Sequence, residues 1–305
     1  MPAIRLPAPG RRFVIGVPYA WLVVFFLLPF LILLYISFVD MGNDIQPFKP
    51  IWDAQTGVLK LKYENYWSIF RTGDGGTLFQ TLYVEAYGRS IWYALCTAVL
   101  CLVIGYPFAY FIARSEPSLR PALLMMVMLP FWTSFLLRVY AWKGILADQG
   151  VLNRLLMALG LVNEPVQMLY TNVSMLVGMT YVYLPFMVLP LYANLVKMDI
   201  RLLEAARDLG ASPLQAFWLV TVPLSKAGIV AGFMLVFIPA VGEFVIPSLL
   251  GGPENLMIGR VVWDEMFTSN NWPRATALAV VMIALIVVPL AIYYHYAGDP
   301  ADARA

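Results

Sequence analysis

The sequence predicts an all-α integral membrane protein with six transmembrane helices. Of its 305 residues, 61% are hydrophobic and only 12% are charged, and the mean hydropathy is +0.75. Soluble domains carry roughly a quarter charged residues, so this much apolar surface needs lipid as its outer solvent. No alternating pattern of a lipid-facing barrel is present, and strands are therefore not expected.

Apolar runs long enough to cross a hydrocarbon core of roughly 30 Å mark the predicted helices. They lie near residues 14–38, 90–113, 121–142, 172–195, 227–250 and 276–296. The first run is longer than the core of a signal peptide, about 7–15 residues, and no small-residue cleavage site follows it. We therefore interpret it as an uncleaved span. Pro130 and Arg138 interrupt the third run, which is tolerated where neighbouring helices satisfy the freed backbone groups.

The placement of basic residues predicts the orientation in the membrane. Lysines and arginines gather before the first run and in the links after the second and fourth runs: Arg5, Arg11, Arg12, Arg114, Arg120, Lys197, Arg201, Arg207 and Lys226. With six spans these segments share one side, and the positive-inside rule makes that side the cytoplasm. The predicted parts are cytoplasmic tails at 1–13 and 297–305, a transmembrane domain at 14–296, an outer loop at 39–89 and a cytoplasmic loop at 196–226.

Several kinds of chemistry are absent from the sequence. It has no G-x-x-x-x-G-K-[ST] phosphate loop, and its single histidine, His295, offers neither a triad nor a zinc site. Cys96 and Cys101 would point about 140° apart on a helix and cannot form a disulfide. The net charge of +2, with no basic stripe, gives no sign of nucleic-acid binding. We expect no catalytic residue, metal or cofactor in this chain, and an integral-membrane enzyme is weakly supported.

The cytoplasmic loop is the most informative part of the chain. Asp199 is a suitable N-cap for a helix over 200–209, and Gly210 supplies its C-terminal stop. Ser212, Pro213 and Gln215 then form a capping box that starts a second helix, which Pro223 is expected to end. The loop could lie on the membrane as an amphipathic segment, or it could receive a partner.

The loop also resembles the EAA loop of ABC-type import permeases. The matching positions are Glu204, Ala205, Ala206, Gly210, Val220, Val222 and Pro223. The usual form has Ile and Leu at the two valines, which are conservative departures, and the resemblance extends from the first run to the sixth. It implies a type I importer fold whose loop docks onto an ATPase through Glu204, Ala205, Ala206, Arg207, Asp208 and Gly210.

A narrower resemblance points to the solute. Residues 239–247, 249–253, 257–261 and 271–273 look like polyamine permeases, with the putrescine system the nearest in character, while Asn65-Tyr66 and 105–110 look like the wider family. The resemblance implies a non-catalytic subunit that forms half of a pathway in the bacterial inner membrane. Its implied partners are an ATPase dimer that binds ATP and Mg, a second permease subunit and a periplasmic binding protein. The exact solute, or another small solute, stays open.

Acidic residues are the candidates for the substrate path. Glu243 follows Lys226 by 17 residues, about 25 Å along a helix, and so lies toward the outer side. It either lines the path and attracts ammonium groups, or makes a local helix-breaking contact or an ion pair. Asp264 and Glu265, in the last outer loop, either meet the cation or the binding protein, or form a solvated face.

A secondary, ion-coupled transporter is the competing interpretation. Such a protein needs ionisable groups inside the membrane, and Glu243 is the clear candidate, with Arg138 the lesser one. Arg138 is expected at the outer interface together with Tyr140 and Trp142. One acid without inverted-repeat symmetry gives little support for ion coupling, and the loop favours the ATP-driven class.

Overall fold

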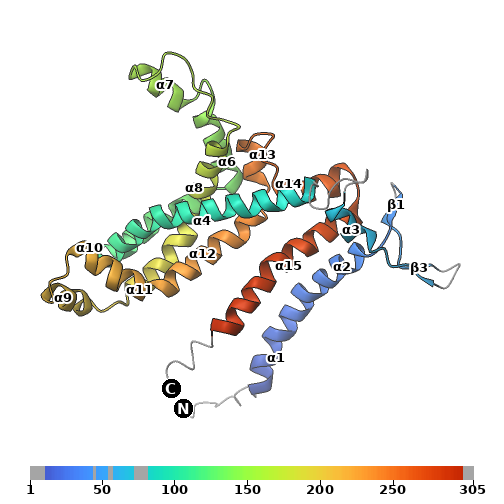
Figure 1. The fold of residues 1–305 in the computed structure, drawn as a ribbon, viewed down its shortest axis with the longest axis horizontal. Coiled ribbons are helices and arrows are strands. Elements are labelled where there is room, and N and C mark those ends of the chain that lie inside the picture. The colour runs from blue at the N-terminus through green and yellow to red at the C-terminus, as the bar shows by residue number, and fades with distance from the viewer. Residues whose placement is uncertain (1–10, 44–45, 54–57, 72–81, 298–305) are drawn as a thin grey trace, which may run out of the picture. The chain divides into compact units, whose positions relative to one another are not determined.

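The computed structural model describes residues 11–43, 46–53, 58–71 and 82–297 (Figure 1). Contacts divide the chain into two compact units, one formed by Met1–Thr81 with Val262–Ala305 and the other by Leu82–Val261. The predicted tails, 1–13 and 297–305, lie almost wholly outside the described residues, and so does the side chain of His295.

The first unit is built on two apolar helical stretches that pack together. α1 (Arg11–Leu22), η1 (Val23–Leu27) and α2 (Leu28–Ser37) follow one another, and the stretch Phe13–Ser37 is long and apolar enough to cross a membrane. α15 (Trp272–Ala297) packs against α2. Large apolar side chains are exposed along most of the first stretch, Phe26 at 74% for example, as expected where lipid is the solvent.

The loop predicted at 39–89 contains short strands that the sequence did not predict. β1 (Met41–Asn43) pairs antiparallel with β2 (Gln46–Phe48), and β3 (Trp52–Asp53) pairs antiparallel with β4 (Val58–Leu59). The lack of a barrel pattern excludes only a lipid-facing sheet, and these hairpins lie outside the apolar runs. The chain is therefore mostly helical rather than entirely so.

A short helix in the same loop covers the end of α2. α3 (Glu64–Phe70) follows the second hairpin, and the buried Asn65 amide donates to the carbonyls of Ser37 and Val39 at 3.0 and 2.9 Å. The Tyr66 hydroxyl lies 2.6 Å from Ser37 Oγ. The two Asn65 bonds satisfy backbone carbonyls at and just beyond the end of α2, where no helical partner follows.

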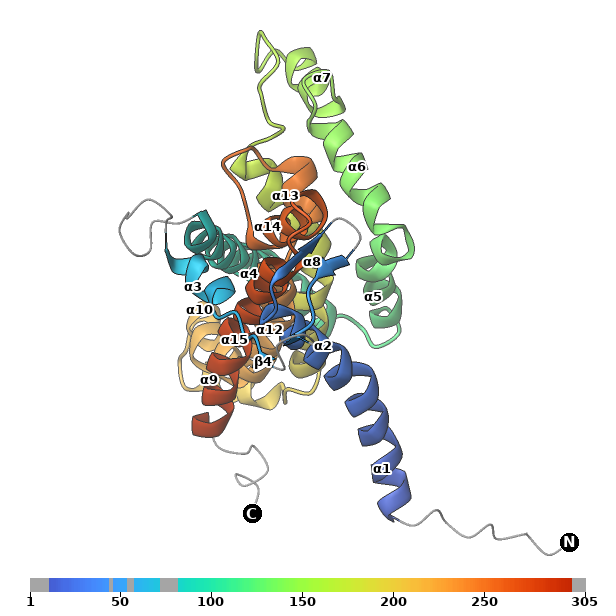
Figure 2. The same cartoon turned by 90° about the vertical axis from the view of Figure 1, so that its right-hand side faces the viewer.

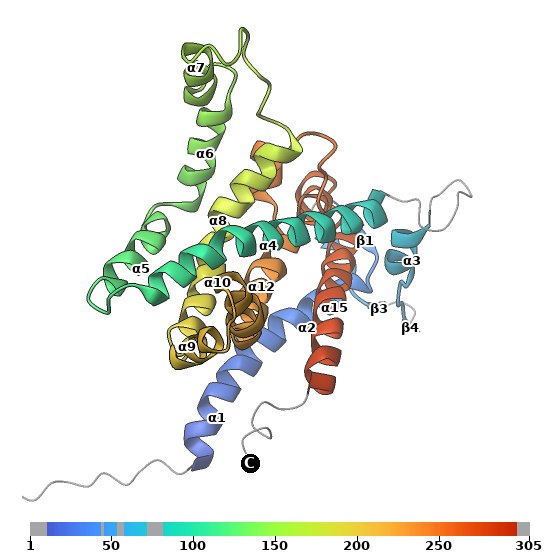
Figure 3. The same ribbon diagram turned by 60° about the vertical axis from the view of Figure 1, so that its left-hand side comes forward.

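Three long helices form the core of the second unit. α4 (Leu82–Arg114), α8 (Asn172–Leu195) and α12 (Lys226–Val241) lie side by side (Figures 1 and 3). Gly228 and Gly232 face α8, because a Cβ on either would lie 2.8 Å from an atom of Asn194 or Met187. Glycines four residues apart on one face let two membrane helices approach closely.

The third predicted run is a broken helix. α5 (Arg120–Met128) and η2 (Leu129–Trp132) lead into α6 (Phe135–Leu146) and α7 (Val151–Ala158), with a bend of 87° between the two halves. Thr133 and Ser134 leave helical geometry at the bend. Figure 2 shows α6 and α7, in green, extending away from α4, α8 and α12 of the same unit.

The remaining predicted runs differ from the helices at their ends. α4 begins at Leu82 rather than near 90, and α12 ends at Val241, with a separate helix α13 (Val245–Leu250) where one run to 250 was predicted. Among the described residues three helices are long and apolar enough to cross a membrane, or up to five if each bent pair is one span. The described apolar part of α15, Trp272–Val288, is shorter than these helices. The count of six crossings and the cytoplasmic termini stay predictions.

Candidate coupling surface and membrane path

The loop at 196–226 folds as the two short helices that its sequence predicts. α9 spans Arg201–Asp208, and the Asp199 carboxylate accepts the Arg201 N–H at 3.0 Å. Gly210 has a φ of +89°, a left-handed conformation that glycine adopts without steric cost. Its N–H donates to the Arg207 carbonyl at 2.9 Å. The glycine stop is confirmed, whereas the predicted N-cap is one residue off: Ile200, not Asp199, directly precedes α9 and makes no side-chain cap.

The second helix begins with the predicted capping box. α10 spans Pro213–Ala216, the Gln215 N–H donates to Ser212 Oγ at 3.3 Å, and the Ser212 N–H donates to Gln215 Oε1 at 2.8 Å. Pro223 does not end the helical stretch, which continues through η3 (Phe217–Thr221) and α11 (Val222–Leu224). Proline is tolerated there because it lies in the first turn of α11. A bend of 67° separates this stretch from α12.

The residues expected to meet a partner lie on the outside of the loop. Glu204, Ala205, Arg207, Asp208 and Gly210 are exposed, and Ala206 is half-buried. The apolar residues Leu209, Leu214 and Leu219 are exposed by 90%, 68% and 73%. Large exposed apolar side chains close in sequence to exposed charges are typical of an interaction site.

Aromatic contacts tie the loop to α4. The Phe217 ring packs edge-to-face against Tyr106 and Tyr110, with centroid distances of 5.5 and 6.0 Å. The Tyr106 hydroxyl lies 2.8 Å from Ser225 Oγ at the start of α12. These contacts link the loop to α4 and to the start of α12.

Glu243 caps α13 instead of facing an open space. Its side chain is 9% exposed, and Oε1 accepts the backbone N–H groups of Phe244, Val245 and Ile246 at 3.2, 3.0 and 3.4 Å. Oε2 accepts the hydroxyl of Tyr183 on α8. A carboxylate at a helix N-terminus is favoured by the unpaired N–H groups and the helix dipole. The structure therefore shows the local helix-breaking contact, and no ion pair joins Glu243 to a described Lys or Arg. Its role in a substrate path stays a prediction.

Close contacts and hydrogen bonds from neighbouring helices hold α13 and α14 (Ile258–Trp263) in place around Glu243. Ser174 Oγ donates to the Leu250 carbonyl at 2.7 Å, and a Cβ on Gly259, in α14, would lie 2.5 Å from the Gly242 carbonyl. Ser90 Oγ accepts the Ile258 N–H at 2.7 Å. Helix α13 is thus fixed from α8, and α14 is fixed from α4.

The Arg138 side chain lies on aromatic rings. Its guanidinium carbon is 4.9 Å from the Phe131 centroid and 5.9 Å from the Phe135 centroid. The Nε and Nη1 atoms are buried and have no hydrogen-bond partner among the described residues. The rings continue from Phe131 to Phe186 at 5.1 Å and on to Tyr183 at 6.2 Å. The sequence did not predict this row, because the break at Thr133–Ser134 hides which side chains share a face.

Asp264 and Glu265 belong to the other unit. They start η4 (Asp264–Thr268) and are half-buried, and both have interaction partners. Their carbonyls accept the N–H groups of Ser269 and Asn271 at 2.9 and 2.8 Å. The fully solvated face that the sequence allowed is not what the structure shows, and their role in cation capture stays a prediction.

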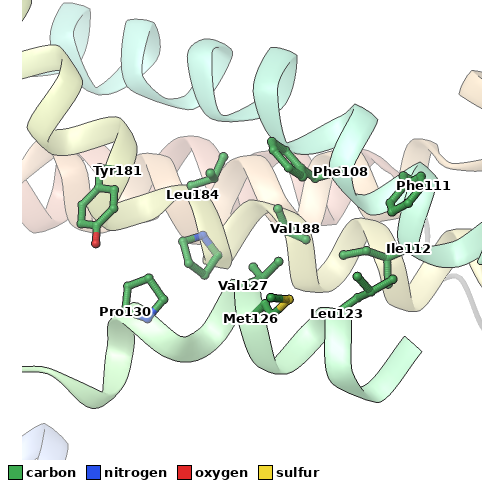
Figure 4. A pocket seen from close by; sticks show the side chains of 11 residues that line it. Phe108, Phe111, Ile112, Leu123, Met126, Val127, Pro130, Tyr181, Leu184 and Val188 are labelled. Atoms are coloured by element: carbon green, nitrogen blue, oxygen red, sulfur yellow. The ribbon is translucent and has the colours of Figure 1, made fainter. Parts of the chain in front are cut away.

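A cavity of about 360 Å³ lies between α4, α5 and α8 (Figure 4). Phe108, Phe111, Met126, Leu184 and other apolar side chains line it. No charged side chain lines it, so it offers no carboxylate that would pair with an ammonium group. Among the described residues no group of three or more His, Cys, Asp or Glu could hold a metal ion.

Known proteins show clear similarity to this chain. Residues 101–298 match the family described as "Binding-protein-dependent transport system inner membrane component". The chain is 37% identical over 286 residues to the spermidine/putrescine transport system permease protein PotB of Haemophilus influenzae, covering 93% of each chain. It is 37% identical over 275 residues to PotB of Escherichia coli K12, covering 90% of this chain and 93% of that protein. It is 33% identical over 228 residues to the inner membrane ABC transporter permease protein YdcU of E. coli K12, covering 70% and 72%.

The fold has a counterpart among solved structures. A bacterial ABC transporter involved in the import of the acidic polysaccharide alginate matches with a TM-score of 0.62 at 18% identity, covering 94% of this chain and 95% of that chain. At this identity the match shows the fold alone. The resemblance to ABC-type import permeases is confirmed, and the apolar helices agree with a multi-pass protein of the bacterial inner membrane. The chain therefore belongs to the family of binding-protein-dependent transport system inner membrane components.

Proposed function

We propose that this chain is a permease subunit of an ATP-driven polyamine importer, with putrescine as its substrate. The observation that carries the proposal is the 37% identity over 93% of the chain to a spermidine/putrescine permease. Spermidine is the alternative substrate, and another small solute is the third. Members of the family are non-catalytic membrane subunits, and the ATPase is a separate protein.

The loop from α9 to α10 is the proposed docking site of the ATPase. Its support is the exposure of Glu204, Arg207 and Asp208 beside exposed leucines, and the ring contacts through Phe217 that link it to α4. The ATPase dimer would bind ATP and Mg, while this chain and a second permease subunit would form the pathway. Solute would arrive on a periplasmic binding protein.

The proposed path passes Glu243, and Asp264 and Glu265 of the other unit are proposed separately as groups that attract the cation. Support comes from the burial of Glu243 beside aromatic rings, since a carboxylate and ring faces are the groups that bind ammonium cations. No bond is made or broken in this chain. The transport cycle needs only different affinities for the solute in outward- and inward-facing states.

A charge reversal tests the docking role. Glu204→Lys should abolish co-purification with the ATPase and solute-coupled ATP hydrolysis, while membrane insertion stays normal. Glu116→Lys, the same change in the short link between α4 and α5, is the matched control and should leave both readouts unchanged. Unchanged assembly and uptake in Glu204→Lys would refute the docking site.

Reconstitution separates the transporter classes and the solutes. Proteoliposomes containing the whole complex should accumulate labelled putrescine only with ATP and binding protein. Accumulation by this chain alone, driven by a proton or sodium gradient, would show a secondary transporter instead. Competition between putrescine and spermidine for the binding protein would identify the preferred solute, and failure of both would exclude a polyamine system.

A further inference from the structure

The second unit contains two buried opposite charges that are not paired with each other. Arg138 presents Nε and Nη1 without a described hydrogen-bond partner, and the Glu243 carboxylate, 9% exposed, has no cationic partner among the described residues. A buried charge that lacks an opposite charge is costly. Each group is therefore prepared to bind an ion of the opposite sign.

The Glu243 carboxylate can accept one more hydrogen bond, at Oε2. Oε1 already accepts three backbone N–H groups, whereas Oε2 accepts only the Tyr183 hydroxyl among the described donors. A carboxylate oxygen has about two acceptor positions. A charged N–H donor would bind Oε2 more strongly than the neutral hydroxyl does.

A continuous row of side chains joins the two charges. The guanidinium of Arg138 rests on Phe131, which packs against Phe186, which contacts Tyr183, the residue bonded to Glu243. The helix that carries Arg138, α6, also packs against α13, the helix that Glu243 caps. A ring face holds a cation more weakly than a buried carboxylate does.

The backbone at Thr133 and Ser134, just before the helix that carries Arg138, has the geometry of a hinge. Thr133 and Ser134 have ψ values of 153° and 137°, so no helical hydrogen bonding spans the 87° break before α6. Rotation about these two residues would shift α6, with Arg138 and Phe135 on it, relative to Phe131, while α13 stays held by its hydrogen bonds.

We propose that Arg138 is a resident cation that competes with the solute's ammonium group for Glu243. With no solute in the path, Arg138 moves from the rings to Oε2 and neutralises the carboxylate. An arriving alkylammonium group takes its place, and Arg138 returns to Phe131 and Phe135. The site therefore admits organic cations that can both pair with a carboxylate and lie on rings. This assignment rests on the proposed polyamine function.

Binding measurements with opposite expected signs test the proposal. The complex of this chain, its second permease and its ATPase is placed in nanodiscs without binding protein, and half-saturation by labelled putrescine and spermidine is measured. R138Q should lower the half-saturating concentration about fivefold or more, the usual lower range of a coupling between sites. F131L, which removes a ring that holds the guanidinium, should raise it. Both effects should vanish in an E243Q background, and R138K, which keeps the cation, should bind as the wild type does.

Several results would overturn the proposal. Equal binding by R138Q, F131L and wild type would do so, as would the same shifts in the E243Q background. If the wild type shows no saturable binding of either polyamine, the proposal still requires saturable binding by R138Q, and its absence there overturns the proposal. Should R138Q not assemble, F131L decides alone. A complete system that transports neither polyamine would instead refute the proposed function, whereas normal transport with unchanged R138Q binding would refute only the role of Arg138.

Discussion

Replacing Gly210 by alanine tests how much the left-handed backbone of this residue contributes to the proposed affinity of the loop for the ATPase. Gly210 has a φ of +89°, and a Cβ at this position would meet nothing within 4 Å, so the change adds no clash. An L-residue in the left-handed region costs about 1–2 kcal/mol. The turn would relax to avoid this cost, which breaks the bond from the Gly210 N–H to the Arg207 carbonyl and changes the angle between α9 and α10. A loss of this size lowers the affinity for the ATPase about 5–30-fold.

The chain provides a matched control for this prediction. Gly160 has a φ of +68° and also has nothing within 4 Å of a built Cβ, but it follows α7, far along the chain from the loop. Gly160→Ala should carry a similar backbone cost and leave ATPase affinity unchanged. The assay is titration of fluorescent ATPase onto each variant in nanodiscs, after equal membrane insertion has been verified.

Two outcomes would refute the reasoning. If Gly210→Ala binds the ATPase as the wild type does, the left-handed turn does not set the docking geometry. If Gly160→Ala weakens binding equally, the effect comes from general destabilisation and not from the loop.

Three further predictions concern a cap, a close contact and a charge. Ser212→Ala removes the cap of α10, which costs about 1 kcal/mol, and should weaken ATPase binding several-fold in the same titration. Gly178→Val places a side chain against Leu250 and should lower the thermal stability of the chain in detergent, because overpacking costs about 1–3 kcal/mol. The hydrogen bond from Lys62 holds the pKa of Asp40 below its usual 3.8. The stabilisation by this pair is therefore present above that value and lost as the pH falls through the lowered pKa, which hydrogen exchange of β1 and β2 should report.

Each of these predictions has its own control. Ser212→Asn, another good N-cap, should retain most of the ATPase affinity. Gly88→Val should unfold at nearly the wild-type temperature, because a Cβ there meets nothing within 4 Å. Asp40→Asn should remove the acid dependence of exchange, and a dependence that persisted in this variant would assign it to another group.

Features set by neighbouring residues could be predicted from the sequence. The capping box of Ser212 and Gln215 needs only three residues of separation, and the left-handed turn at Gly210 needs one glycine after a run of helix formers. Both depend on local geometry that the order of residues already determines. The apolar runs are predictable for the same reason. Side chains that face lipid must be apolar, so each run is visible in its own residues.

Features set by distant partners could not be predicted. Tyr183, which completes the contacts of Glu243, is 60 residues away in the chain, so a cap and a path residue look alike in the sequence. The early start of α4 has a similar cause. Glu85 and Arg89 read as loop residues, yet they pair at 3.3 Å on the helix, and Arg89 also donates to the Glu254 carbonyl at 2.6 Å.

The glycines of α12 determine which parts of the second unit can move. Gly228 and Gly232 bring α12 against α8 with no gap for side chains, so neither helix can slide or turn without the other. We expect the two helices to move together. Tyr183 of α8 is hydrogen-bonded to Glu243 beyond one end of α12, and the loop at 196–226 joins the other end. If this loop docks the ATPase as proposed, a displacement of the loop would move α8 and α12 as one unit. A change of angle within the unit would then have to occur elsewhere, and the break before α6 has the backbone geometry for it.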